Sequence, residues 1–182
     1  MLRRSLSIPL LIAILVVLVD QASKLLIIEN FFEGQSVSII GDLLYFQFIF
    51  NEGGAMGTRI GPSWIYTILT IVALILIVRY LLFDKSENMT TAVALSLISG
   101  GAVGNLIDRI RFGKVVDFID MDFPDIEFLN LYRWFTFNIA DAAISVGLVI
   151  FIINLIIIDR RKNDSESPTE IEEIPEIKGD DQ

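Results

Sequence analysis

Four long apolar runs separate the polar parts of this chain. They cover residues 8–28, 64–83, 89–107 and 137–158. A helix of about 20 residues is long enough to cross the roughly 30 Å hydrocarbon core of a bilayer. The runs therefore predict four transmembrane helices. The first run could also be a cleaved signal peptide, but no small-residue cleavage site follows it and three more spans do, so we expect it to be retained.

Two segments outside the runs have a different character. Residues 44–50 are rich in aromatic and β-branched side chains, which favours a strand, and the turn-forming residues 51–54 follow it. A small sheet at the membrane surface is expected there. Residues 163–182 are acidic and poor in aromatics, which is typical of disorder. The predicted fold is an all-α membrane protein of four transmembrane helices in residues 1–162. It carries a small extracytoplasmic β element on the first outer loop, and a disordered cytoplasmic tail follows.

Basic residues near the ends of the runs predict the orientation. They gather on one side, before the first helix, between the second and third, and after the fourth, at Arg3, Arg4, Arg79, Lys85, Arg160, Arg161 and Lys162. Positive charge marks the cytoplasmic face. Both termini are therefore expected in the cytoplasm, with loops 29–63 and 108–136 outside. The second outer loop also carries basic residues, which suggests that acids hold some of them for function.

Composition narrows the chemistry. The sequence contains no cysteine and no histidine, which excludes a thiol nucleophile, a Ser–His triad and a His-ligated metal. The net charge is −9, but the last twenty residues hold eight acids and one lysine, so the membrane part is nearly neutral. No basic face for nucleic acid is indicated. Any enzyme chemistry must use carboxylates, lysine or tyrosine.

Ionisable side chains inside a span are costly, by roughly 2.5–3.5 kcal/mol at a helix centre, and persist when they are paired or functional. Asp20 and Lys24 are four residues apart and share one helical face. They could neutralise each other, contact a substrate, or do both. Asp141 lies near the start of the fourth span, one turn after Asn138. It could be a carboxylate favoured by the helix dipole or a functional acid.

The third span ends in Asn105, Asp108 and Arg109 at the same outer level. Asp108 and Arg109 could form a surface pair. Asp117 follows between Val115-Val116 and Phe118-Ile119. It could be the solvated acid of an interfacial strand, although a carboxylate among apolar residues is unusual there.

Five motifs occur in order along the chain. They are Val19-Asp-Gln-Ala-Ser-Lys24, Asn51-Glu-Gly-Gly-Ala-Met56, Gly104-Asn-Leu-Ile-Asp-Arg109, Val115-Val-Asp-Phe118 and Phe137-Asn-Ile-Ala-Asp141. Together they closely resemble lipoprotein signal peptidase, or signal peptidase II, over residues 8–158. The second motif departs from the family pattern, because Gly54 and Met56 replace the usual Ala and Phe. That change affects packing rather than the polar groups.

The resemblance implies an aspartic endopeptidase of the bacterial cytoplasmic (inner) membrane, with its active site at the outer face. It would remove the signal peptide of a prolipoprotein before a diacylglyceryl-modified cysteine. The catalytic pair would be Asp117 and Asp141. The supporting positions would be Asp20, Lys24, Asn51, Asn105, Asp108, Arg109 and Asn138. The resemblance also implies no cofactor or metal, a monomer among membrane lipids, and inhibition by cyclic peptide antibiotics of the globomycin type.

Three other functions fit part of the pattern. A transporter or proton channel could use Asp20 and Asp141, but such proteins usually have more spans and broken helices at the midplane. A Ser–Lys protease would need Ser23 and Lys24 to meet, yet adjacent helical residues point about 100° apart. A structural scaffold that presents the acidic tail to a partner leaves the clustered polar residues unexplained.

Overall fold

A computed structural model describes residues 7–54, 61–83, 88–122 and 135–166, the side chains as far as residue 159. The helices are α1 (Ser7–Asn30), α2 (Ser63–Phe83), α3 (Met89–Phe112) and α4 (Ile139–Glu166). The strands are β1 (Ser36–Ile40), β2 (Leu44–Asn51) and β3 (Val115–Met121). All four helices are long and apolar enough to cross a membrane. The expected four-span fold is therefore confirmed.

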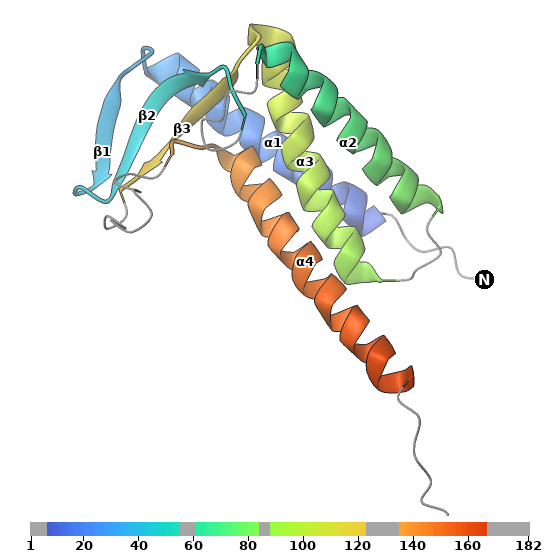
Figure 1. Ribbon diagram of the computed structural model, residues 1–182. Coiled ribbons are helices and arrows are strands. Elements are labelled where there is room, and N and C mark those ends of the chain that lie inside the picture. Colours follow the sequence, from blue (N-terminus) through green and yellow to red (C-terminus); the bar gives the residue numbers. More distant parts are fainter. Residues whose placement is uncertain (1–6, 55–60, 84–87, 123–134, 167–182) are drawn as a thin grey trace, which may run out of the picture.

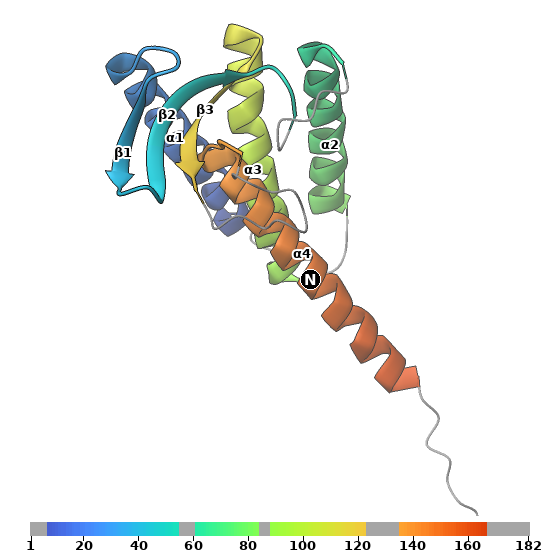
Figure 2. The same cartoon turned by 60° about the vertical axis from the view of Figure 1, so that its left-hand side comes forward.

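Helix α3 lies at the centre of the bundle and packs against α1, α2 and α4 (Figure 1). Most of its membrane-spanning part is buried by the other helices, whereas α1, α2 and α4 expose leucine, isoleucine and valine side chains. Those exposed side chains form the surface that lipid would cover. The protein is thus organised around α3, and α2 meets the bundle mainly through it (Figure 2).

Glycines let α3 approach its neighbours closely. A Cβ atom on Gly100 would lie 2.8 Å from the carbonyl oxygen of Ala13 in α1. On the α4 side, a Cβ on Gly101 would clash with the carbonyl of Ala140, and one on Gly147 would lie 2.7 Å from that of Ala94. Small residues at such contacts allow tight packing of membrane helices. The α3–α4 contact made by Gly101 and Gly147 is called the glycine seam below.

Helix α3 extends five residues beyond the predicted span. It ends where Gly113 adopts a left-handed conformation (φ 73°) and donates its backbone N–H to the carbonyl of Arg109, 2.9 Å away. Glycine is the usual residue for this kind of helix end. As a result, Asp108 and Arg109 occupy the last turns of a helix and are not part of a loop. Their side chains are directed by the helix toward fixed neighbours.

The three strands form one antiparallel sheet in the order β1-β2-β3, beside the C-terminal end of α1 and the start of α4 (Figure 1). Its core consists of Phe48, Val116 and Phe118, which pack with Ile27 of α1. The β element was expected on the first outer loop alone, but the second outer loop supplies β3. Because β2 pairs with β3 and both strands pack on Ile27, both loops are held at the end of α1.

Helix α4 begins at Ile139 and runs to Glu166, beyond the predicted end at residue 158. The first residues of the expected tail, 163–166, therefore have helical backbone. The rest of that tail, 167–182, lies outside the described residues. So do Arg3, Arg4, Lys85 and the altered motif position Met56, and the side chains of Arg160, Arg161 and Lys162 are not described either.

Candidate active site

The start of α4 fixes the position of Asp141. Asn138 precedes the helix, and its Oδ1 accepts a hydrogen bond from the backbone N–H of Asp141 (2.9 Å). In return, Oδ2 of Asp141 accepts from the backbone N–H of Asn138 (3.2 Å). This reciprocal arrangement is a capping box, which satisfies two N–H groups that a helix start would leave unpaired. Asp141 is thus a helix-terminal acid, as its position suggested, but its second oxygen serves another partner.

Strand β3 brings Asp117 to the same place. Its side chain is 1% exposed. One carboxylate oxygen accepts from Nδ2 of Asn51 on β2 (2.9 Å), and the other accepts from Nδ2 of Asn138 (2.7 Å). The interfacial strand considered as an alternative for this residue is present, but its carboxyl group is buried and not solvated. Asn138 contacts both acids, so it joins them directly.

The surroundings of Asp117 disfavour its charged form. Burial raises the pKa of Asp117 to about 7, and the negative charge of Asp141 acts in the same direction. The hydrogen bonds from Asn51 and Asn138 oppose this rise in pKa, and so does the positive charge of Lys24. Desolvation therefore dominates. A carboxyl group with such a pKa can hold a proton near neutral pH.

Asn105 of α3 connects Asp141 to a buried layer of charges. Its Nδ2 donates to Oδ1 of Asp141 (2.8 Å). Its Oδ1 accepts from Nζ of Lys24 (3.0 Å) and from Nδ2 of Asn138 (3.1 Å). Because the lysine can only donate, it fixes which side of the Asn105 amide faces Asp141. Asn105 therefore orients one acid through its contact with a cation.

Lys24 lies in the layer behind the two acids and is 2% exposed. Its Nζ pairs with Asp20 (2.9 Å) and with Asp108 (2.8 Å). Asp20 also accepts from the backbone N–H of Ala140 (2.9 Å), and Asp108 from that of Val116 (3.1 Å). The i,i+4 pair expected from the sequence is present. These side chains tie α1 and α3 to the first turn of α4 and to β3, and none of the three lines the cavity described below.

Gln21 was quoted in the first motif but given no role, yet it bridges α1 and α3. Its Nε2 lies within hydrogen-bonding distance of Asp20 (3.1 Å), Asp108 (3.0 Å) and the carbonyl of Gly104 (3.1 Å). Gly104 makes room for this contact, because a Cβ there would lie 2.5 Å from an oxygen of Asp20. The only sequence signal was an amide next to an intramembrane acid. Gln21 belongs to the structural support of the site.

Arg109 points away from its neighbour Asp108, so the surface pair considered above does not form. Asp108 is buried and pairs with Lys24, whereas Nη2 of Arg109 donates to the carbonyl of Gly53 (3.3 Å). The guanidinium carbon lies 5.9 Å from the ring centre of Tyr66 in α2. Its buried Nε has no hydrogen-bond partner among the residues that the structure describes. Arg109 thus retains a donor that could serve a bound ligand.

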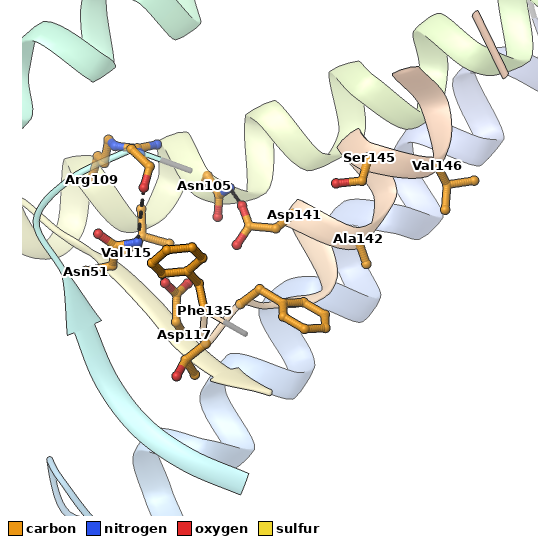
Figure 3. A pocket seen from close by; sticks show the side chains of 13 residues that line it. Asn51, Asn105, Arg109, Val115, Asp117, Phe135, Asp141, Ala142, Ser145 and Val146 are labelled. Atoms are coloured by element: carbon orange, nitrogen blue, oxygen red, sulfur yellow. Dashed lines mark hydrogen bonds between the residues drawn. The ribbon is translucent and has the colours of Figure 1, made fainter. Parts of the chain in front are cut away.

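A cavity of about 300 Å³ opens onto the two acids. Asn51, Asn105, Arg109, Asp117 and Asp141 provide its polar wall, and Figure 3 shows both carboxyl groups at the same space. Its other wall is apolar or small and consists of Gly54, Val115, Phe135, Thr136, Phe137, Ala142, Ser145 and Val146. Within the described part of the chain, no three acids are grouped to hold a metal ion. The nine residues singled out from the sequence therefore form one cluster, five at the cavity and four behind it.

Comparison with known proteins gives consistent matches over most of the chain. A family model described as signal peptidase (SPase) II matches residues 12–157. A lipoprotein signal peptidase from Syntrophus aciditrophicus is 35% identical over 152 residues, covering 81% of this chain and 91% of the relative. One from Halalkalibacterium halodurans is 34% identical over 151 residues, covering 83% and 93%.

Solved structures match as well. A protein described as a bacterial membrane enzyme superposes with a TM-score of 0.78 at 33% identity, covering 93% of this chain and 97% of the other. A second, described in the same words, gives a TM-score of 0.73 at 35% identity, covering 84% and 95%. The similarity in sequence and in structure thus extends over all four helices.

Proposed function

The chain belongs to the signal peptidase II family, and we propose that it is an aspartic endopeptidase in which Asp117 and Asp141 activate a water molecule. Membership of this family supports the removal of signal peptides from lipoproteins. One observation supports the aspartic mechanism above all others. Two carboxyl groups from different elements line one cavity and share Asn138, while the sequence has no cysteine or histidine to act instead.

In the proposed mechanism, Asp117 carries a proton and Asp141 is ionised. The raised pKa of Asp117 favours the first state, and the positive end of the α4 dipole favours the second. Asp141 takes a proton from water, whose oxygen attacks the scissile carbonyl carbon. Asp117 donates its proton to the developing oxyanion. Asp141 then passes its proton to the leaving nitrogen as the C–N bond breaks, and Asp117 regains a proton when the carbonyl forms again.

The proposed substrate is a prolipoprotein with a diacylglyceryl-modified cysteine. The lipid anchors that cysteine at the membrane surface. Asp117 and Asp141 lie at the end of the bundle that carries the sheet, where α4 begins (Figure 1). The bond before an anchored cysteine would therefore reach the cavity without leaving the membrane. From its family we also expect the protein to act as a monomer and to be inhibited by cyclic peptides of the globomycin type.

The direct test is cleavage of a lipid-modified prolipoprotein by the purified protein in detergent or liposomes. We expect one cut, before the modified cysteine, identified by the masses of the two products. The same precursor without the lipid should be cleaved at least about tenfold more slowly. Absence of cleavage in folded protein, together with ion flux in liposomes, would favour a transporter instead.

Orientation gives a second test, in which the site faces outward from the bacterial cytoplasmic membrane. The basic residues near the helix ends support this topology. Cysteines introduced at Gln35 and Asp125 should react with a membrane-impermeant reagent in intact cells, whereas one at Ser167 should react only after lysis. Because the protein has no native cysteine, the background is low. Labelling at Ser167 alone would reverse the proposed orientation.

The raised pKa of Asp117 predicts how stability depends on pH. Between about pH 4 and pH 7 this carboxyl group is ionised in the unfolded chain but protonated in the folded protein. Unfolding then releases a proton, so rising pH favours the unfolded state. The resulting loss in the free energy of unfolding reaches at most about 4 kcal/mol at pH 7 and is constant at higher pH. Wild-type Tm should therefore fall across this window more than the Tm of Asp117→Asn.

The measurement is a thermal melt of both proteins from pH 4 to pH 8. Turnover gives a separate readout, because loss of the same proton above pH 7 should lower kcat by about tenfold per pH unit. Parallel Tm curves for the two proteins would show that Asp117 does not hold a proton in the folded state. The proton would then have to be assigned to another group.

A further inference from the structure

A serine of α4 lines the cavity beyond the two acids. Ser145 follows Asp141 by four residues and lies on the same wall as Ala142 and Val146 (Figure 3). Four residues of helix correspond to about 6 Å along the axis. Because α4 runs inward from Asp141, Ser145 lies deeper in the membrane than the acids. The cavity therefore continues from Asp117 and Asp141 toward the hydrocarbon, and a hydroxyl group lies along it.

The hydroxyl of Ser145 differs from those of three other helical residues, Ser96, Ser99 and Thr70. Ser96 donates to the carbonyl of Ala92 (2.7 Å), and Ser99 donates to that of Leu95 (2.5 Å). Thr70 donates in the same way to the carbonyl of Tyr66 (2.8 Å). A bond to the carbonyl four residues earlier is the usual solution inside a helix. Among the described residues, Ser145 makes no hydrogen bond, and its side chain is exposed.

A substrate of the proposed kind would supply the missing partner. A signal peptide spans the membrane as an apolar helix, and the last four carbonyl groups of a helix have no partner within it. No water satisfies them inside the hydrocarbon. The residues before the scissile bond lie on the membrane side of the two acids, as Ser145 does. A donor at this depth would therefore stabilise the end of the signal peptide where its helix stops.

We propose that Ser145 is a substrate-positioning residue that donates a hydrogen bond to a main-chain carbonyl of the signal peptide. An extended peptide rises about 3.3 Å per residue, so a distance of about 6 Å corresponds to the second residue before the scissile bond. The contact aligns that bond with Asp117 and Asp141 and takes no part in proton transfer. The assignment of Ser145 rests on the proposed function.

Three substitutions separate the hydroxyl from side-chain size. Ser145→Ala removes the hydroxyl with little change in volume and should raise KM by about five- to tenfold, the effect of one hydrogen bond. The kcat should stay within about twofold, since the contact is equal in the ground and transition states. Ser145→Thr and Ser145→Val have the same shape, so only the threonine variant should keep a KM near the wild-type value.

A matched control and a modified substrate complete the test. Ser99→Ala removes a hydroxyl already bonded within α3 and should leave KM unchanged. A set of prolipoproteins carries a single thioamide, which is a weaker acceptor than an amide, at one of the last three residues before the cut. With the wild-type protein, the thioamide should raise KM at only one of these three positions. That sensitivity should disappear with Ser145→Ala.

Two results would overturn the role of Ser145 while leaving the peptidase intact. One is a wild-type KM in both Ser145→Ala and Ser145→Val. The other is the same thioamide sensitivity in wild type and Ser145→Ala. If the wild-type protein failed to cleave the lipid-modified precursor at all, the proposed function and the role of Ser145 would both be wrong.

Discussion

Replacing either Asp117 or Asp141 with asparagine should lower kcat by about 10³-fold or more, and replacing both should be hardly worse. In the proposed mechanism the two acids share one proton, so each needs the other in the complementary protonation state. Asparagine keeps the size of the side chain and a carbonyl oxygen that can accept a hydrogen bond, but it cannot exchange a proton. The measurement is turnover of a lipid-modified prolipoprotein by wild type, the two single variants and the double variant.

This comparison is informative only if each variant still folds and still binds substrate. In Asp141→Asn the retained oxygen can still accept from the N–H of Asn138, so α4 should start at the same residue. Asp42→Asn, in the exposed turn between β1 and β2, is the matched control and should keep full activity. Substantial turnover by either folded single variant would rule out the aspartic pair and place a transporter function first.

Replacing Lys24 with methionine should lower the free energy of unfolding by roughly 3–5 kcal/mol, because it leaves Asp20 and Asp108 buried without their cation. In a protein of this size that corresponds to a fall in Tm of roughly 6–20 °C. Methionine keeps the length of the side chain, so the loss reports the charge and its hydrogen bonds. The fraction that stays folded should bind substrate more weakly if Asn105 loses its orientation.

Two variants test whether the loss of stability comes from the buried carboxylates that Lys24 leaves unpaired. Lys114→Met removes a partly exposed lysine, 3.7 Å from Glu52, and should change Tm by no more than about 2 °C. Adding Asp108→Asn to Lys24→Met removes one uncompensated charge and should restore part of the lost stability. A Lys24→Met protein that is fully stable and binds substrate normally, yet has no turnover, would require a catalytic role for Lys24.

The four helices could be predicted because each apolar run has the length that a bilayer demands. The candidate site could be located because polar side chains inside apolar segments have few reasons to persist. Asp20, Lys24, Asn105 and Asp141 were all detectable on that basis. Asn138 was detectable in the same way, and the motif order then added Asn51, whose type alone is unremarkable in a loop. Local pattern and cost of burial thus account for most of the prediction.

The remaining features depend on contacts between distant parts of the chain. The pairing of β2 with β3 places Asn51 next to Asp117, 66 residues later, and no local pattern encodes that register. The central place of Asn138 arises only when α4, β3 and α3 meet. The different directions of Asp108 and Arg109 could have been predicted, because neighbouring side chains on a helix point about 100° apart. They were missed because the third helix was expected to end at residue 107, five residues before its observed end at Phe112.

The glycine seam determines which parts of the enzyme can move. Backbone lies against backbone where Gly101 meets Ala140 and Gly147 meets Ala94, and such contacts cannot slide by a fraction of a residue without a clash. Asn105 and Asp141 are carried by these two helices, so their relative geometry should be the same with and without substrate. Helix α2, which meets the bundle mainly through α3, has no such constraint from α4. Any movement that accompanies substrate entry is therefore expected outside the α3–α4 pair, which should stay rigid.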